Sequence, residues 1–345
     1  MNFALSRRLS PSASRTLCAG TSILMAIPQG GRILGLWADT GENFLWTHPR
    51  LIDPVPVVAD APSTWPNPGG DRTWLAPEID LFLGDLADAA GTYAVPSAFD
   101  PGTWRLDTES DGSMSAVLET DLKIRRKGSH ARIRLKKHWR ILENPSTRSA
   151  ATPQAAYEQT VQLTILETSD PGLSLGIWNL AQLPAPGWML MATHAKTLPQ
   201  NVFGNLAETD FTVTPNLVVW RMAGSGDAKI ALHARDFAGL AGHLHRRSDD
   251  LWDLVVREIT VDPAGAYIDA LWSDPSRQGW AFQACQVRSL AGGFNELEHH
   301  APAATLGHPA EDRSRLWAWR GSAATIRALA EERFGTLPEN IFTSP

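Results

Sequence analysis

Hydrophobic and polar residues alternate with a period of two along two long neighbouring stretches of the chain. Between Met114 and Ile124 the even positions are mostly apolar and the odd positions mostly polar, and residues 131–141 repeat the pattern with cations on the polar face. Successive side chains of a strand point to opposite faces, so the pattern predicts two half-buried strands. Lys127-Gly128-Ser129 provides a turn between them, which predicts a hairpin. Its cations are interpreted as a solvated sheet face that lies beside the acidic Glu119 and Asp121.

Shorter apolar runs separated by turn signals predict strands through most of the remaining chain. A glycine-rich pattern predicts two neighbouring strands at residues 30–37 and 41–46, and further strands are expected at residues 23–27, 159–167, 173–180, 188–193, 217–222, 229–234, 251–261, 266–272, 280–287 and 294–300. Turn signals at such short intervals are typical of an all-β sandwich. We therefore expect an all-β fold in which an N-terminal extension over residues 1–20 precedes a single domain over residues 21–345.

Helical periodicity is scarce. Ser322 is suited to cap a helix over residues 322–334, and Gly335 to end it. A weaker helical pattern covers residues 79–90. The Pro- and Gly-rich residues 54–70 are expected to form a long loop.

Composition and charge exclude several classes of protein. The 345 residues are 43% hydrophobic and 20% charged, which excludes a mainly disordered chain. A net charge of −6 gives no general attraction for nucleic acid or anionic membranes, and no apolar run is long enough to span a membrane. The N-terminus has no convincing signal peptide, so we expect a cytoplasmic protein. The oligomeric state stays open.

Standard catalytic and metal-binding signatures are missing. The sequence has no phosphate-binding loop, dinucleotide fingerprint, zinc-protease motif or nucleophile elbow. Cys18 and Cys285 lie too far apart in sequence for metal-ligand spacing. The nearby His233, His243 and His245 lack an evident carboxylate or thiolate partner, so no metal site is predicted.

Two short segments concentrate groups that could bind a polar ligand. A Gly-Gly loop presents the cation Arg72, the indole of Trp74 and the carboxylate of Glu78 within seven residues. In the late stretch Glu296, Glu298 and His300 would share one face of an extended strand. Three ionisable groups on one face need water, each other or a ligand, because burying them unpaired is costly.

The segments together resemble the galactose mutarotase-like superfamily, which includes the aldose 1-epimerases. The glycine-rich strands, the Gly-Gly loop and the acidic strand before Pro302 follow the order of the family, and Trp178-Asn179-Leu180 matches its aromatic-Asn-Leu motif. This resemblance covers residues 23–302. It implies a large antiparallel β-supersandwich, here with a short C-terminal helix, and a sugar or sugar derivative bound on a concave sheet. Fourteen Trp residues agree with sugar recognition, because indole faces pack against sugar rings.

The resemblance also implies roles for individual residues. The catalytic base of the family corresponds best to Glu298, with Glu296 as the next candidate, and Arg72 lies near the sugar-binding loop. The family places its two histidines where this chain has Leu175-Gly176-Ile177 and Asn67-Pro68, so His194 or His300 would have to replace the acid.

The implied reaction moves protons at the anomeric centre of a sugar and requires no metal or organic cofactor. Arg72, Trp74, Glu78, Trp178 and Glu296 are then expected to contact the substrate. Two alternatives remain open. The chain could be a sugar-binding module without catalysis, or a polysaccharide lyase or hydrolase, which would need a second carboxylate opposite Glu298.

Overall fold

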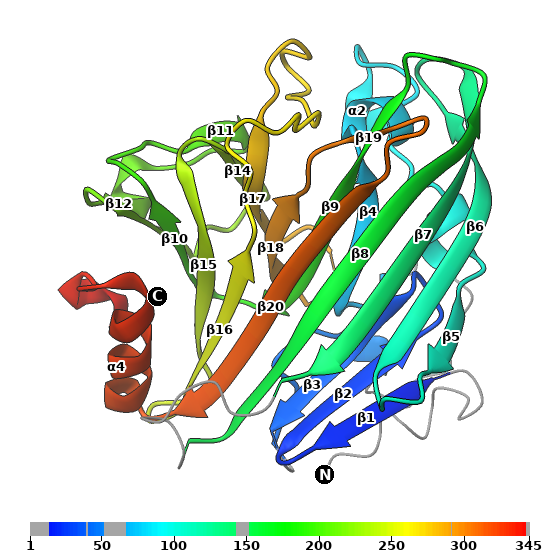
Figure 1. Ribbon diagram of the computed structural model, residues 1–345. Coiled ribbons are helices and arrows are strands. Elements are labelled where there is room, and N and C mark those ends of the chain that lie inside the picture. The colour runs from blue at the N-terminus through cyan, green and yellow to red at the C-terminus, as the bar shows by residue number, and fades with distance from the viewer. Residues whose placement is uncertain (1–13, 39–40, 52–66, 143–151, 291, 343–345) are drawn as a thin grey trace.

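Two large antiparallel sheets pack face to face in the computed structural model, which describes residues 14–38, 41–51, 67–142, 152–290 and 292–342 (Figure 1). Sheet I contains β1 (Arg15–Ala19), β2 (Ser22–Ile27), β3 (Arg32–Ala38), β4 (Asp71–Ala76), β9 (Ser174–Pro184), β18 (Phe294–His300), β17 (Trp280–Val287), β14 (Ala228–His233) and β11 (Gln200–Phe203) in that spatial order, with β19 (Ala304–Thr305) paired to β9. Sheet II contains β12 (Phe211–Val213), β13 (Leu217–Met222), β10 (Gly187–Thr193), β15 (Phe237–Arg246), β16 (Trp252–Ile259), β20 (Ala310–Gly321), β8 (Gln154–Thr168), β7 (Ser129–Ile141), β6 (Met114–Ile124) and β5 (Arg105–Thr108). The predicted all-β supersandwich with a short C-terminal helix is confirmed.

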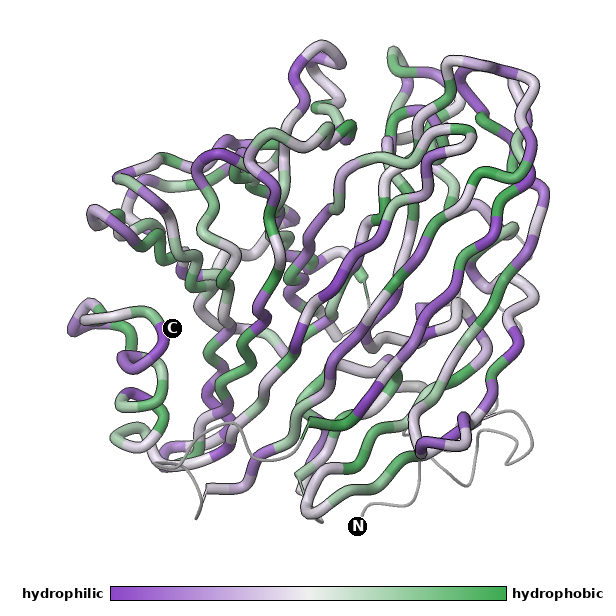
Figure 2. The backbone as a smooth tube through the Cα atoms, viewed as in Figure 1, coloured by the Kyte–Doolittle hydropathy of each residue, from purple (hydrophilic) through white to green (hydrophobic). Residues whose placement is uncertain are grey.

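The predicted hairpin forms β6 and β7 at one side of sheet II. Met114 pairs with Trp139 and Ile124 with Ser129, so the turn lies where the sequence places it. Hydrophilic and hydrophobic residues alternate along these strands (Figure 2). On the solvent face Glu119 accepts hydrogen bonds from Arg132 and Arg134, which confirms that the cations lie beside an acidic strand.

The two sheets enclose one large core to which the inner faces of both contribute. The strands in the middle of sheet I are buried on both faces, as the uniformly buried pattern of β18 shows. Polar residues join the sheets across the core. Asn179 on β9 donates a hydrogen bond of 2.9 Å to Asp312 on β20, and His299 lies 3.0 Å from the same carboxylate. Because side chains alternate along a strand, the neighbours of these residues point away from sheet II.

The C-terminal helix α4 (Ala323–Phe334) covers a second, smaller core on the other face of sheet II. Ile326, Leu329, Ala330 and Phe334 pack there with Trp residues of β16 and β20. Gly335 ends the helix with a φ of 78°, a conformation that favours glycine.

Substituting Ser322 with Ala is expected to lower the free energy of unfolding by about 1 kcal/mol. Ser322 Oγ accepts a hydrogen bond of 3.2 Å from the backbone N–H of Thr325, which would lose its partner. Urea denaturation at neutral pH measures the change. An unchanged midpoint and slope would contradict this capping role.

Several local predictions differ from the structure. Residues 266–272 form irregular loops instead of a strand, and residues 41–46 are also irregular, because Asn43 supplies hydrogen bonds to the backbone of β3 in place of strand pairing. The helical pattern at 79–90 is split into two single turns, α2 (Glu78–Leu81) and α3 (Ala89–Thr92). The extension expected over residues 1–20 contains β1, which pairs with β2.

The remaining helical turns are short: η1 (Pro49–Leu51), η2 (Ala98–Gly102), η4 (Glu208–Asp210) and η5 (Glu339–Phe342). Most of the loop predicted at 54–70 lies outside the described residues. Among the residues that are described, no helix has the length and apolar character needed to cross a membrane.

Candidate functional site

The Gly-Gly loop segment and the late acidic strand meet on either side of β9. Arg72 on β4 and Glu298 on β18 both pair with Leu180 of β9. The guanidinium of Arg72 donates a hydrogen bond of 2.9 Å to Glu296 Oε1, although the two residues are 224 positions apart in sequence. The structure thus brings the two predicted segments together, on the face of sheet I that points away from sheet II.

Aromatic side chains lie between these charged groups. The guanidinium of Arg72 lies 4.0 Å from the ring centre of Trp74, and Trp74 contacts Trp178 edge to face at 5.4 Å. Both indoles are buried. Trp74 Nε1 donates to Asp100, so this indole is fixed by a hydrogen bond as well as by packing.

Glu298 has one oxygen occupied and one oxygen without a partner. Oε2 accepts a hydrogen bond of 2.8 Å from Trp178 Nε1 and lies 3.0 Å from Lys229 Nζ. Oε1 is buried and has no hydrogen-bond partner within the described residues. Burial raises the pKa of this carboxyl to about 7, although the Lys229 ammonium lowers it. Glu298 can therefore gain and release a proton near neutral pH.

Lys229 on β14 belongs to the cluster, and the sequence analysis missed it. It pairs with Cys285 of β17, whose neighbour in β18 is Glu296. Burial lowers the pKa of this ammonium, but the carboxylates of Glu298 and Glu78 raise it by more, so Lys229 stays charged at neutral pH. Its Nζ also lies 4.6 Å from the ring centre of Trp178.

His300 lies on the same strand face as Glu298 and stacks on Trp178 at 5.5 Å. Both of its ring nitrogens are buried without a hydrogen-bond partner in the described parts of the chain, and Nε2 lies 3.8 Å from Asp269. Burial lowers the pKa of His300 to about 4, so the imidazole is neutral at pH 7.

His194 is not part of this cluster. It is exposed in a bend that follows β10 of sheet II, and its backbone N–H donates to Asp236. The prediction placed it in the strand after the aromatic-Asn-Leu motif, but the chain passes from sheet I to sheet II between β9 and β10.

Glu78 borders the cluster, held by two aromatic side chains that the sequence analysis did not select. Its carboxylate accepts hydrogen bonds from Tyr93 at 3.3 Å and from Trp272 at 2.9 Å. The backbone N–H of Glu78 donates a hydrogen bond to Asp269, which also accepts a hydrogen bond of 2.8 Å from Gln283. Burial and then Asp269 raise the pKa of Glu78, against the lowering effect of Lys229.

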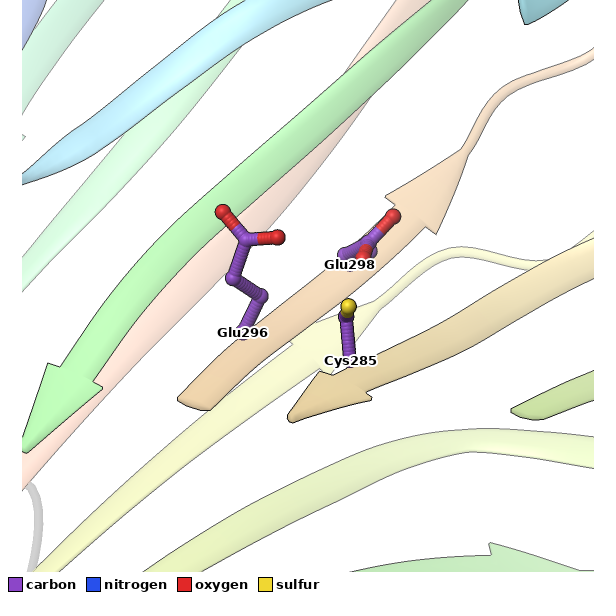
Figure 3. A group of neighbouring side chains, drawn as sticks. All are labelled: Cys285, Glu296 and Glu298. Atoms are coloured by element: carbon purple, nitrogen blue, oxygen red, sulfur yellow. The ribbon is translucent and has the colours of Figure 1, made fainter. Parts of the chain in front are cut away.

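Cys285, Glu296 and Glu298 could in principle share a metal ion, because their ligand atoms lie within 4.8 Å of one another (Figure 3). However, Arg72 and Lys229 already neutralise the two carboxylates. Burial also raises the pKa of Cys285, which keeps it a neutral thiol, whereas metals bind the thiolate. The charges of the group are thus balanced by side chains.

The comparisons with known proteins identify the fold. No protein-family profile matches the chain, and no curated protein matches its sequence. Among solved structures, a galactose mutarotase-like protein from Lactobacillus casei superposes with a TM-score of 0.51 at 11% identity, covering 89% of this chain and 99% of its own. A candidate aldose 1-epimerase from Escherichia coli K12 superposes with a TM-score of 0.50 at 15% identity, covering 90% and 99%. The chain therefore has the galactose mutarotase-like fold, as its sequence motifs predicted.

Proposed function

We propose that this chain binds a sugar or sugar derivative on the outer face of sheet I and interconverts its anomers in an aldose 1-epimerase-like reaction. The observation that carries the proposal is the hydrogen bonding of the Glu298 carboxylate. Its Oε2 is held by Trp178 and Lys229, while Oε1 is free of partners among the described residues. A carboxylate fixed in this way, with a pKa of about 7, is suited to general base catalysis near neutral pH.

Each neighbouring group then has a chemical role. Glu298 Oε1 accepts the proton of the anomeric hydroxyl, the bond between C1 and the ring oxygen breaks as the carbonyl forms, and the ring oxygen takes up a proton from water to become a hydroxyl. Rotation about the C1–C2 bond and the reverse steps, in which Glu298 returns its proton to the anomeric oxygen and the ring oxygen releases its own to water, close the ring as the other anomer. His300 is neutral and donates an N–H hydrogen bond to the ring oxygen, while the Lys229 ammonium stabilises the negative charge that develops. Arg72, Trp74, Trp178, Glu78 and Glu296 hold and orient the sugar.

A second candidate is a sugar-binding module that does not catalyse. The neutral state of His300 favours it, because a neutral imidazole is a weak proton donor. The family's two histidine positions hold Leu175-Gly176-Ile177 and Asn67-Pro68 here.

Polarimetry tests the proposal. Freshly dissolved α-glucose and α-galactose should equilibrate faster with the protein, and Glu298→Gln should lose about 100-fold or more of the acceleration. The rate should rise with pH through about 7, because the base must be ionised. Glu119→Gln, a carboxylate on the solvent face of sheet II, is the matched control and should keep full activity.

The result separates the two candidates. Sugar binding measured by calorimetry without any acceleration would support the binding module. If no sugar in a panel either binds or equilibrates faster, the carbohydrate proposal is wrong.

A further inference from the structure

Carboxyl groups outnumber cations in the cluster around Glu298. Among the described residues of this site, the carboxyl groups belong to Glu78, Asp269, Glu296 and Glu298, and the cations are Arg72 and Lys229; all are at most 8% exposed. Arg72 pairs with Glu296 and Lys229 with Glu298. Within the described parts of the chain, no further cation is paired with Glu78 or Asp269, because the His300 imidazole 3.8 Å from Asp269 is neutral. The hydrogen bonds of these two carboxyl groups come from Tyr93, Trp272, Gln283 and a backbone N–H.

The unpartnered oxygens at this site also favour one kind of ligand. Gln182 and Gln283 each donate Nε2 to a carboxylate, at 3.0 Å to Glu296 and 2.8 Å to Asp269. These bonds fix the amide orientation, since a carboxylate accepts only from the NH₂ end. The Oε1 atoms of both amides and of Glu298 are therefore buried acceptors without a donor in the described chain. A ligand that satisfies them must bring N–H or O–H groups.

We propose that this site selects sugars without a negative charge, and that it binds an amino sugar more tightly than the matching neutral sugar. The proposal rests on the function proposed above and adds the substrate class. A phosphate or carboxylate brings only acceptors and a charge of the same sign as the surplus carboxylates, so desolvating it here is unfavourable. A protonated amine brings three donors and the opposite charge.

Isothermal titration calorimetry at pH 7 with sugars that differ in charge tests this selectivity. The probes are glucosamine, glucose, glucose 6-phosphate and glucuronate, together with galactosamine and galactose. We expect glucosamine to bind several-fold more tightly than glucose, and both anionic sugars to bind at least about tenfold more weakly than glucose. These measurements use the unmodified protein, so they do not depend on whether a variant folds.

The outcomes separate this inference from the proposed function. Equal affinities across the charges, or tighter binding of an anionic sugar, would overturn the charge selectivity and leave sugar binding intact. Failure of every sugar to bind would overturn both.

A carboxyl variant gives an independent check of the cause. Glu78→Gln should narrow the difference in affinity between glucose and glucose 6-phosphate several-fold, because it removes the negative charge that the ionised form of Glu78 contributes to the site. Glu119→Gln removes a carboxylate from sheet II and should leave that difference unchanged. A difference that is identical in the wild type and a folded Glu78→Gln variant would show that the surplus charge does not determine the selectivity.

Discussion

Replacing Arg257 with methionine is expected to lower the free energy of unfolding by about 3–5 kcal/mol. Arg257 on β16 pairs with Asp71 on β4, and both side chains are fully buried between the sheets. Tyr157 on β8 also donates to Asp71 and accepts a hydrogen bond of 3.1 Å from Arg257. Without the guanidinium, the Asp71 carboxylate would remain buried without its counter-charge, which is the costly step.

Urea denaturation at pH 7 measures this loss, and Arg132→Met is the matched control. Arg132 pairs with Glu119 on the solvent face of sheet II and is half exposed, so its removal should cost no more than about 1 kcal/mol. The double variant Asp71→Leu with Arg257→Met should be more stable than Arg257→Met alone, because the buried carboxylate that lost its counter-charge is also removed. Similar losses for Arg257→Met and Arg132→Met would contradict the importance of burial.

The same ion pair is expected to make the free energy of unfolding depend on pH in the acid range. Burial raises the pKa of Asp71, but Arg257 lowers it by more, so the folded-state pKa lies below the ordinary value of 3.8. The pair therefore stabilises the fold fully above pH 3.8, and this contribution is lost as the pH falls through the lower folded-state pKa.

Half-buried strands could be predicted from the sequence because their two faces meet different surroundings. In β6 and β7 one face meets the core and the other meets water, so the composition alternates. The strands of sheet I near the site are buried on both faces. In β18 the alternation still assigned Glu296, Glu298 and His300 to one face. It could not show that His299 on the other face pairs with Asp312 of sheet II.

The sequence predicted the site residues that lie together in short segments with several chemical groups. It missed residues that reach the site only through the pairing register of strands far apart in the sequence. Arg72 and Trp74 lie on β4 and Glu78 begins α2, within seven residues of sequence, and only β9 separates β4 from the acidic strand β18. Lys229 is a single charge in an otherwise apolar strand, and it reaches Glu298 only through the pairing of β14, β17 and β18. Asp269 and Trp272 lie in irregular loops that the hydrophobic pattern had assigned to a strand.

Replacing Lys229 with methionine is expected to raise the pKa of Glu298 by about 1–3 units above its value near 7. The ammonium lies 3.0 Å from Oε2 and favours the ionised carboxyl, whereas burial and the neighbouring Glu296 oppose it. Removing the cation leaves burial and Glu296, which disfavour ionisation, opposed among the described contacts by the hydrogen bond from Trp178 Nε1. If Glu298 is the base, the acceleration of mutarotation at pH 7 should fall roughly 5- to 500-fold and return as the pH rises.

Carbon NMR titration of the glutamate carboxyl resonances measures this pKa directly, with Glu298→Gln identifying the signal. Lys229→Arg keeps a cation and should return the pKa towards that of the wild type, whereas Lys136→Met removes an exposed lysine of sheet II and should have no effect. The readout does not require catalysis, so it distinguishes the electrostatics of the site from its proposed reaction. A pKa of Glu298 that is the same with and without the ammonium would show that Lys229 does not control the charge of this carboxyl. Sugar binding would then remain possible, but without a neighbouring cation that adjusts the pKa of the catalytic base. Among the described contacts of Glu298, Lys229 alone brings a positive charge to the carboxylate.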